Sequence, residues 1–223
     1  MSQFRCISLE TATTQGSVAG SRGERVAVRT LNDSRTSSRE IFGLVAEVLE
    51  ELELKPGELD CIAYGCGPGS FTGVRVAASA AQGLAYAQSL PVCRVSSLEA
   101  MAASVMREQS VTKVAACLDA RMDEAYLGVY SAVENGRLQC EFSDALIDPA
   151  EYKLMVSYPD AFPAGNGWEI WPAMLTDLDG ETDFSARPKA YDVLELARNQ
   201  FADGLSIAPA EALPNYVRDN VTQ

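Results

Sequence analysis

Short apolar runs separated by turns alternate along this chain with longer stretches whose apolar residues recur at helical spacing. Three short runs near the start, residues 3–11, 17–21 and 24–30, predict a meander of β-strands. The following stretch, 33–53, predicts a helix because its apolar residues share one stripe, from which Phe42 departs: Ile41, Leu44, Val45, Val48, Leu49 and Leu52. An apolar run at 59–65 then predicts a buried strand.

A similar order of elements begins again after residue 110. Predicted strands at 113–118, 124–131 and 137–142 form a second meander, and 161–164 and 190–202 predict a further strand and a helix. The expected fold is therefore α/β, built from two related βββα-type halves of which the second is reduced. We expect the boundaries to be 1–109 for the first half and 110–223 for the second.

A glycine-rich loop joins the strand at 59–65 to a helix predicted over 72–88. Its sequence, GCGPGSFTGVR, lacks the lysine of a P-loop and the spacing of a GxSxG hydrolase turn. Backbone N–H groups at a helix start attract anions, and Ser70 or Thr72 can cap this helix. The candidate anion or nucleotide loop consists of Gly67, Gly69, Ser70, Thr72 and Gly73.

The helix at 72–88 is rich in alanine and apolar all round, which predicts burial on more than one face. Together with the helix at 33–53 it carries more apolar surface than one stripe facing a sheet requires. Such surplus surface is typical of a protein interface, although an overfilled core would explain it too. The predicted interface residues are Phe42, Val45, Leu49, Ala77, Ala80, Ala81 and Leu84.

The amino-acid composition excludes several kinds of catalytic and binding site. The 223 residues include no histidine, which excludes Ser-His-Asp and Cys-His sites, and the six cysteines never form CxxC and are expected to be buried thiols. We expect no metal site. The net charge of −13 argues against direct nucleic-acid binding, and the absence of a signal peptide or membrane span predicts a cytoplasmic protein.

Several motifs together resemble the bacterial TsaB (YeaZ) family of the ASKHA superfamily, which has actin-like and Hsp70-like folds. They are ETAT at 10–13, GPGSFTGVR at 67–75, DARMDEAY at 119–126 and PNYVRDNV at 214–221. The resemblance extends over most of the chain and is collinear, which makes it more specific than any one glycine motif.

The resemblance implies that acidic residues ending the first strand of each half once positioned metal and phosphate. The corresponding positions here are Glu10, with Thr11 beside it, and Asp119. Glutamate stands at residue 10 where DTAT is expected, and Cys66 stands where relatives carry arginine before the glycine loop. We therefore regard these positions as degenerate and assign no catalytic residue.

The resemblance further implies a non-catalytic scaffold or activating subunit, not an enzyme by itself. Its partners would be a TsaD-like catalytic paralogue and a TsaE-like ATPase, in the complex that transfers threonylcarbamoyl to the adenosine adjacent to the tRNA anticodon. ATP, ADP and metal would belong to those partners, tRNA would be touched only indirectly, and the same helices could form a homodimer. The alternatives are a small-molecule kinase or ATPase and, further off, a peptidase.

Overall fold

The computed structural model describes residues 4–31, 37–152, 157–175 and 181–217, and the chain divides into two compact units. Unit 1 is Met1–Ala100 with Pro188–Asn215, and unit 2 is Met101–Arg187 with Tyr216–Gln223. We expected a single boundary, at residue 110. The first boundary lies instead after Ala100, and a second one follows Arg187, where the chain returns to unit 1 and forms helix α6 (Ala190–Ala202). A helical pattern alone does not tell which sheet the helix will cover.

Unit 1 is built on a five-stranded sheet with the order β3-β2-β1-β4-β5. The first three strands form the predicted antiparallel meander, and β4 and β5 continue the sheet in parallel with β1. Their bounds are β1 (Arg5–Glu10), β2 (Ser17–Arg22), β3 (Arg25–Thr30), β4 (Cys61–Gly65) and β5 (Val92–Val95).

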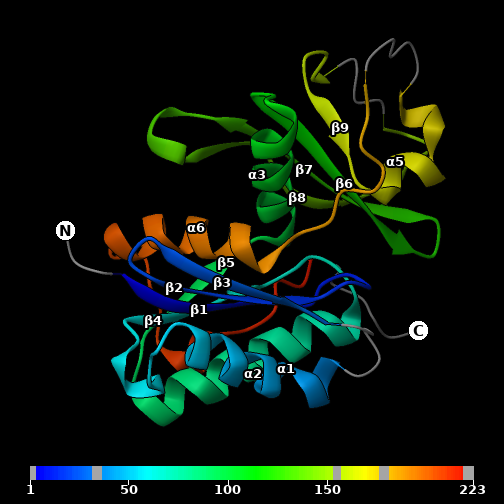
Figure 1. Cartoon of the computed structure of the whole chain (residues 1–223). Helices are drawn as coiled ribbons and strands as arrows, with labels where there is room; N and C mark the ends of the chain where they lie inside the picture. Colours follow the sequence, from blue (N-terminus) through cyan, green and yellow to red (C-terminus); the bar gives the residue numbers. More distant parts are fainter. Residues whose placement is uncertain (1–3, 32–36, 153–156, 176–180, 218–223) are drawn as a thin grey trace. The chain divides into compact units, whose positions relative to one another are not determined.

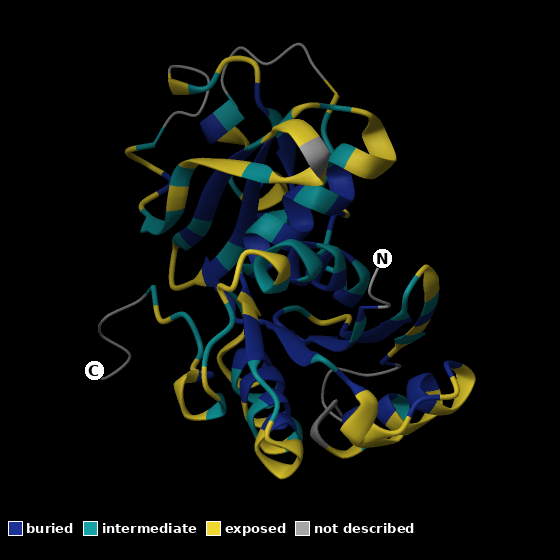
Figure 2. Ribbon diagram, turned by 90° about the vertical axis from the view of Figure 1, so that its left-hand side faces the viewer, coloured by how far each residue is buried: buried dark blue, intermediate teal, exposed yellow. Residues whose placement is uncertain are grey.

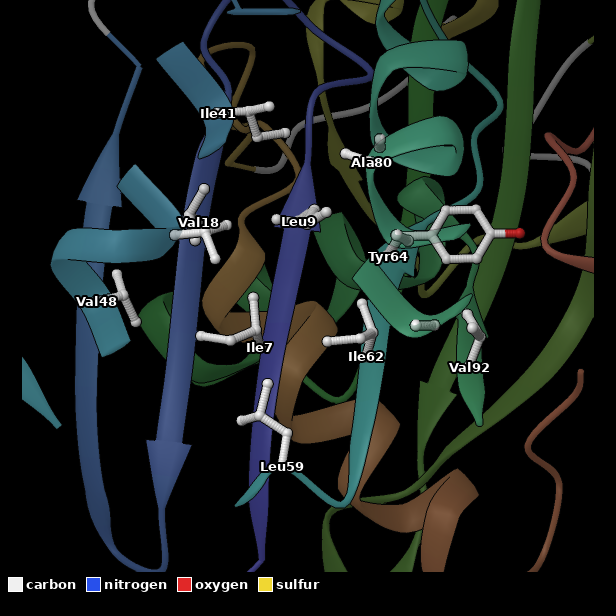
Figure 3. Packing of buried hydrophobic residues seen from close by; sticks show 14 of the residues in the cluster. Ile7, Leu9, Val18, Ile41, Val48, Leu59, Ile62, Tyr64, Ala80 and Val92 are labelled. Carbon is white, nitrogen blue, oxygen red and sulfur yellow. The ribbon is translucent and has the colours of Figure 1, made fainter. Parts of the chain in front are cut away.

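Helices cover both faces of this sheet, as Figure 1 shows, with α1 (Ser37–Glu51) and α2 (Phe71–Gln88) on one side and α6 on the other. Successive side chains of a strand point to opposite faces, so Ile7 and Leu9 of β1 enter the core under α1 and α2 (Figure 3). Ser8 faces the other way, and its hydroxyl donates to the carbonyl of Ala190 in α6 (2.7 Å).

The last part of unit 1 pairs with the β5 edge of the sheet. Val92 and Ile207 exchange both backbone hydrogen bonds (2.9 and 2.8 Å), so the start of this edge strand is already paired. The hydroxyl of Tyr64 then donates to the carbonyl of Leu213 (2.9 Å), and the side chain of Gln82 in α2 donates to that of Pro209 (3.0 Å). Residues far apart in sequence therefore hold α2 in place.

Unit 2 has a four-stranded sheet with the order β8-β7-β6-β9, in which only β9 is parallel to its neighbour β6. Its core contains Trp168, whose indole N–H donates to the carbonyl of Ala115 (2.9 Å). The strands are β6 (Lys113–Arg121), β7 (Glu124–Ala132), β8 (Leu138–Ile147) and β9 (Phe162–Ala164), followed by helix α5 (Asn166–Ile170). Helix α3 (Ser97–Gln109) begins in unit 1 and continues into unit 2.

The structure confirms the predicted α/β fold with two meanders and a reduced second half. Short 3-10 turns lie at η1 (Pro56–Glu58), η2 (Glu134–Gly136), η3 (Pro172–Leu175) and η4 (Pro209–Glu211). The predicted start of the first helix, Asp33, lies outside the described residues. Within the described ranges, no helix is both long and apolar enough to span a membrane.

Candidate interaction surface and glycine loop

A groove of about 350 Å³ runs between α1 and α2 in unit 1. Figure 2 shows that the inner strands of this unit are largely buried, whereas each of these helices has a buried and an exposed side. The edge strand β3 is partly exposed. Phe42 of α1 and Phe71 of α2 are 52% and 56% exposed, an unusual placement for large aromatic side chains. The described residues that line the groove are Ile41, Phe42, Phe71, Thr72, Arg75, Val76, Ser79 and Ala80.

The predicted interface residues divide between this surface and the core. Phe42 is exposed as expected from its place off the apolar stripe, and Leu84 is half-buried. The other five, Val45, Leu49, Ala77, Ala80 and Ala81, are buried in the core of unit 1, although Ala80 also lines the groove. Their part in an interface stays a prediction, and their burial argues against it for all but Ala80. The small side chains of α2 are used to pack α2 on the sheet, on α1 and on η4.

The sequence analysis did not predict Phe71, Arg75 and Ser79 as interface residues, although their spacing places them on one face of α2. Phe71, Arg75 and Ser79 are four residues apart along α2 and therefore lie above one another on the helix surface. Their mixture of aromatic, cationic and hydroxyl groups lacks the apolar periodicity by which helix faces are usually found. An aromatic residue directly after a helix cap, outside the stripe, was the available signal.

The glycine loop packs tightly against the chain that leaves β1. The N–H of Ser70 donates to the carbonyl of Ala12 (2.7 Å), and the hydroxyl of Thr11 donates to the carbonyl of Gly73 (2.6 Å). A Cβ at Gly73 would lie only 1.9 Å from the carbonyl oxygen of Thr11. Glycine is needed here so that the two backbones can approach each other.

Several donors that an anion would need are already used within the loop. The N–H of Gly67 donates to the Ser97 hydroxyl (3.2 Å), and the N–H of Gly73 donates to the hydroxyl of the N-cap residue Ser70 (3.4 Å). Thr72 is exposed at the groove and belongs to the surface just described. Anion binding by Gly67, Gly69, Ser70, Thr72 and Gly73 stays a prediction, and this geometry argues against it.

Glu10 ends β1 with a fully buried side chain. One carboxylate oxygen accepts from the N–H of Ala12 (2.6 Å) and the other from the hydroxyl of Ser97 (2.8 Å). Burial raises the pKa of Glu10 to about 6, partly offset by these hydrogen bonds. Gly65 of the neighbouring strand leaves the necessary space, since a Cβ there would lie 1.8 Å from a Glu10 oxygen.

Asp119 stands at the corresponding place in unit 2, where β6 approaches its hairpin. Its carboxylate accepts from the N–H of Arg121 (2.7 Å) and pairs with the Arg121 guanidinium (3.0 Å), while its own N–H donates to the side chain of Asn166 (3.3 Å). This is the ion-paired turn that commonly joins two strands. No group of three or more metal-ligating residues occurs in the part of the chain that the structure describes.

The reactive groups that a peptidase would need are poorly placed. Five of the six cysteines are buried, only Cys140 is exposed, and burial raises the pKa of the Cys117 thiol. A raised pKa keeps a thiol protonated and therefore weakly nucleophilic. The hydroxyl of Ser70 accepts the helix-capping hydrogen bond from Gly73 and has no histidine to activate it.

Comparison with known proteins gives a consistent picture. The family model TsaD, "tRNA N6-adenosine threonylcarbamoyltransferase", matches residues 32–223. Among curated relatives, the tRNA threonylcarbamoyladenosine biosynthesis protein TsaB of Escherichia coli (strain K12) is 34% identical, with 98% of this chain and 96% of the relative covered. TsaB of Haemophilus influenzae is 33% identical, with 100% and 97% covered.

The solved structure of YeaZ from Pseudomonas aeruginosa is similar to this chain over both units. The TM-score is 0.88 at 34% identity, covering 96% of this chain and 99% of YeaZ.

Proposed function

The chain belongs to the TsaB (YeaZ) family of tRNA threonylcarbamoyladenosine biosynthesis proteins, and within that pathway we propose that it is a non-catalytic subunit that binds a TsaD-like paralogue. The single observation that carries the proposal is the groove between α1 and α2 with its exposed Phe42 and Phe71. Exposed aromatic side chains around an apolar hollow are typical of the central residues of a protein interface.

A paralogue is a suitable partner because it is built on the same fold. The TsaD family model matches this chain from residue 32, a range that includes both groove helices. A TsaD-like protein therefore carries its own counterparts of α1 and α2, and matching helix pairs can pack against each other as in a pseudo-symmetric dimer. The same surface would serve a homodimer when the paralogue is missing.

The absence of turnover in this chain is the second part of the proposal. The N–H groups of Gly67 and Gly73 in the glycine loop are engaged within the chain, and Glu10 is buried against Ser97 instead of facing a ligand. ATP, ADP and metal are accordingly assigned to the TsaD-like and TsaE-like proteins. With a net charge of −13, the chain leaves tRNA contact to its cytoplasmic partners.

The proposal is tested by light scattering after size exclusion, with this chain mixed with the TsaD-like protein of the same organism. We expect a one-to-one complex, and we expect Phe42→Asp to weaken it at least tenfold because a desolvated charge replaces an aromatic contact. Leu205→Asp, at a residue that is 64% exposed outside the groove, is the matched control and should bind normally. No complex with the wild-type chain would overturn the proposal.

The competing kinase or ATPase hypothesis makes the opposite prediction for the isolated chain. ATP hydrolysis by the purified chain, abolished by Glu10→Gln, would support an enzyme and contradict a non-catalytic subunit. We expect no turnover above a buffer control.

A further inference from the structure

The residue that follows β1, Thr11, ties that strand to the start of α2. It is only 3% exposed and is not among the described residues that line the groove. The Thr11 hydroxyl donates to the carbonyl of Gly73 (2.6 Å), in the first turn of α2. The Thr11 carbonyl also stands against Gly73, where a Cβ would lie only 1.9 Å from its oxygen. The chain that leaves β1 therefore holds the first turn of α2.

A second hydrogen bond completes this attachment. The N–H of Ser70, the N-cap residue of α2, donates to the carbonyl of Ala12 (2.7 Å). The attachments at residues 70 and 73 flank Phe71 and Thr72, which both line the groove. Because Phe71 is 56% exposed, packing of its ring in the core cannot fix this turn, and the hydrogen bonds beside it contribute correspondingly more.

The ring of Phe71 is coupled to the backbone of the same turn. The Arg75 guanidinium lies 3.3 Å from the centroid of the Phe71 ring and donates to the Phe71 carbonyl (2.8 Å). A guanidinium that stacks on a ring and binds the backbone of the same residue restricts how the ring turns relative to the helix. A shift of the first turn of α2 therefore displaces the exposed ring with it.

We infer that Thr11 is a positioning residue for the partner interface: its hydroxyl fixes the first turn of α2 and thereby sets where Phe71 meets the partner. The inference rests on the proposed function, since it gives a residue outside the groove a role at that same groove. The centre of an interface packs as densely as a protein interior, so a small displacement of an aromatic ring loses contacts. The ETAT motif at 10–13 thus acts on the groove through Thr11.

The substitution Thr11→Val tests the inference because valine has the shape of threonine but no hydroxyl. We expect the dissociation constant for the TsaD-like protein, measured by titration calorimetry, to rise roughly fivefold, as one lost hydrogen bond would cause. Thr11→Ser keeps the hydroxyl and should stay within about twofold of wild type. Thr11→Ala removes the hydroxyl without placing a methyl group against the Gly73 carbonyl and should agree with Thr11→Val.

Ser8→Ala is the matched control on β1. Ser8 is fully buried, and its hydroxyl donates to the carbonyl of Ala190 in α6, on the opposite face of the sheet from α2 (2.7 Å). Its loss should lower the thermal stability much as Thr11→Val does, which circular dichroism measures. The dissociation constant for the TsaD-like protein should nevertheless change by less than about twofold, because the site is remote from the groove.

A double-mutant cycle shows whether Thr11 acts through Phe71. Phe71→Ala weakens the complex by itself because it removes the exposed ring. In that background, adding Thr11→Val should raise the dissociation constant by less than about twofold, because the ring whose place Thr11 sets is gone. Two residues that contribute independently would instead show the same loss in both backgrounds.

The outcomes separate the inference from the proposed function beneath it. If wild type does not bind the TsaD-like protein, the proposed function is overturned and the inference falls with it. If wild type binds and both Thr11→Val and Thr11→Ala bind equally well, the inference alone is overturned. It is also overturned if Ser8→Ala weakens binding as much as Thr11→Val, or if the full loss persists beside Phe71→Ala.

Discussion

The two units repeat one arrangement but develop it to different extents. In each, an antiparallel meander is joined by a parallel strand, β4 beside β1 and β9 beside β6, and that strand leads through a glycine-containing turn into a helix. In unit 1 this helix is α2, with 18 residues, whereas in unit 2 it is α5, with 5 residues. The long helix turns Phe71, Arg75 and Ser79 toward the groove in addition to the face that packs in the core of unit 1.

The acidic residues near the end of the first strand of each unit, Glu10 and Asp119, also differ in their burial and in their partners. Glu10 is buried in a network that ties the end of β1 to Ser97 and the glycine loop, while Asp119 pairs with Arg121 in an exposed hairpin. Each acid keeps its place in the topology, but each is now bound by its own chain. The difference teaches that acids at corresponding places in two related sheets can be held by quite different surroundings, one by burial and the other by an ion pair.

The largest expected effect concerns the glycine that brings the loop against β1. Gly73→Ala should destabilise unit 1 by about 3 kcal/mol or more, because its Cβ would meet backbone that has no room to yield. Urea unfolding followed by circular dichroism measures the change. Gly83→Ala is the control in the same helix, where an added Cβ meets nothing within 4 Å, and should be neutral or slightly stabilising. Equal effects of the two substitutions would contradict the close approach.

A smaller loss is expected from the indole that anchors α5 in unit 2. Trp168→Phe should lower the free energy of unfolding by roughly 2 kcal/mol, because it removes buried volume and leaves the Ala115 carbonyl without its donor. Trp171→Phe, at a half-buried residue of the same region, should cost clearly less. Hydrogen exchange resolves the site of the change: protection should fall in β6 and β9 and stay unchanged in the sheet of unit 1.

The smallest effect, and the one that depends on pH, is expected at Glu10. Burial raises its pKa to about 6 from an ordinary 4.5, so the folded protein loses stability as the pH rises from 4.5 to 6, where the unfolded chain ionises before the folded one, and the full loss remains above pH 6. Glu10→Gln removes that cost and should be more stable than wild type by roughly 1–2 kcal/mol at pH 8. As the pH falls from 6 to 4.5 most of the advantage should disappear, because the wild-type carboxyl is then neutral in the folded protein and half protonated in the unfolded chain.

Urea titrations at pH 8 and pH 4.5 measure this difference. Asp119→Asn is the matched substitution in unit 2, and we expect it to show no comparable gain at pH 8, since its carboxylate keeps an ion pair with Arg121. A Glu10→Gln variant whose stability relative to wild type is the same at both pH values would rule out the buried titration.

Local patterns in the chain were sufficient to predict most of the elements and their order. Apolar runs of five to nine residues marked both meanders, the stripe from Ile41 to Leu52 marked α1, and Ser70 followed by an alanine-rich stretch marked α2. These signals are local, since strand and helix periodicity and helix capping depend on residues that are neighbours in sequence. The family resemblance rests on the same short motifs.

The tertiary structure decided which surfaces those elements expose. Alanine has no preferred partner, so nothing within α2 told that the faces of Ala77 and Ala81 are covered by the sheet, by α1 and by the distant segment around Pro209. The return of α6 to unit 1 and the burial of Glu10 beside Ser97 likewise depend on contacts over 80 or more residues. The composition of α2 predicted burial on more than one side, but only the packing of remote segments determines which elements cover those sides and which side is left for a partner.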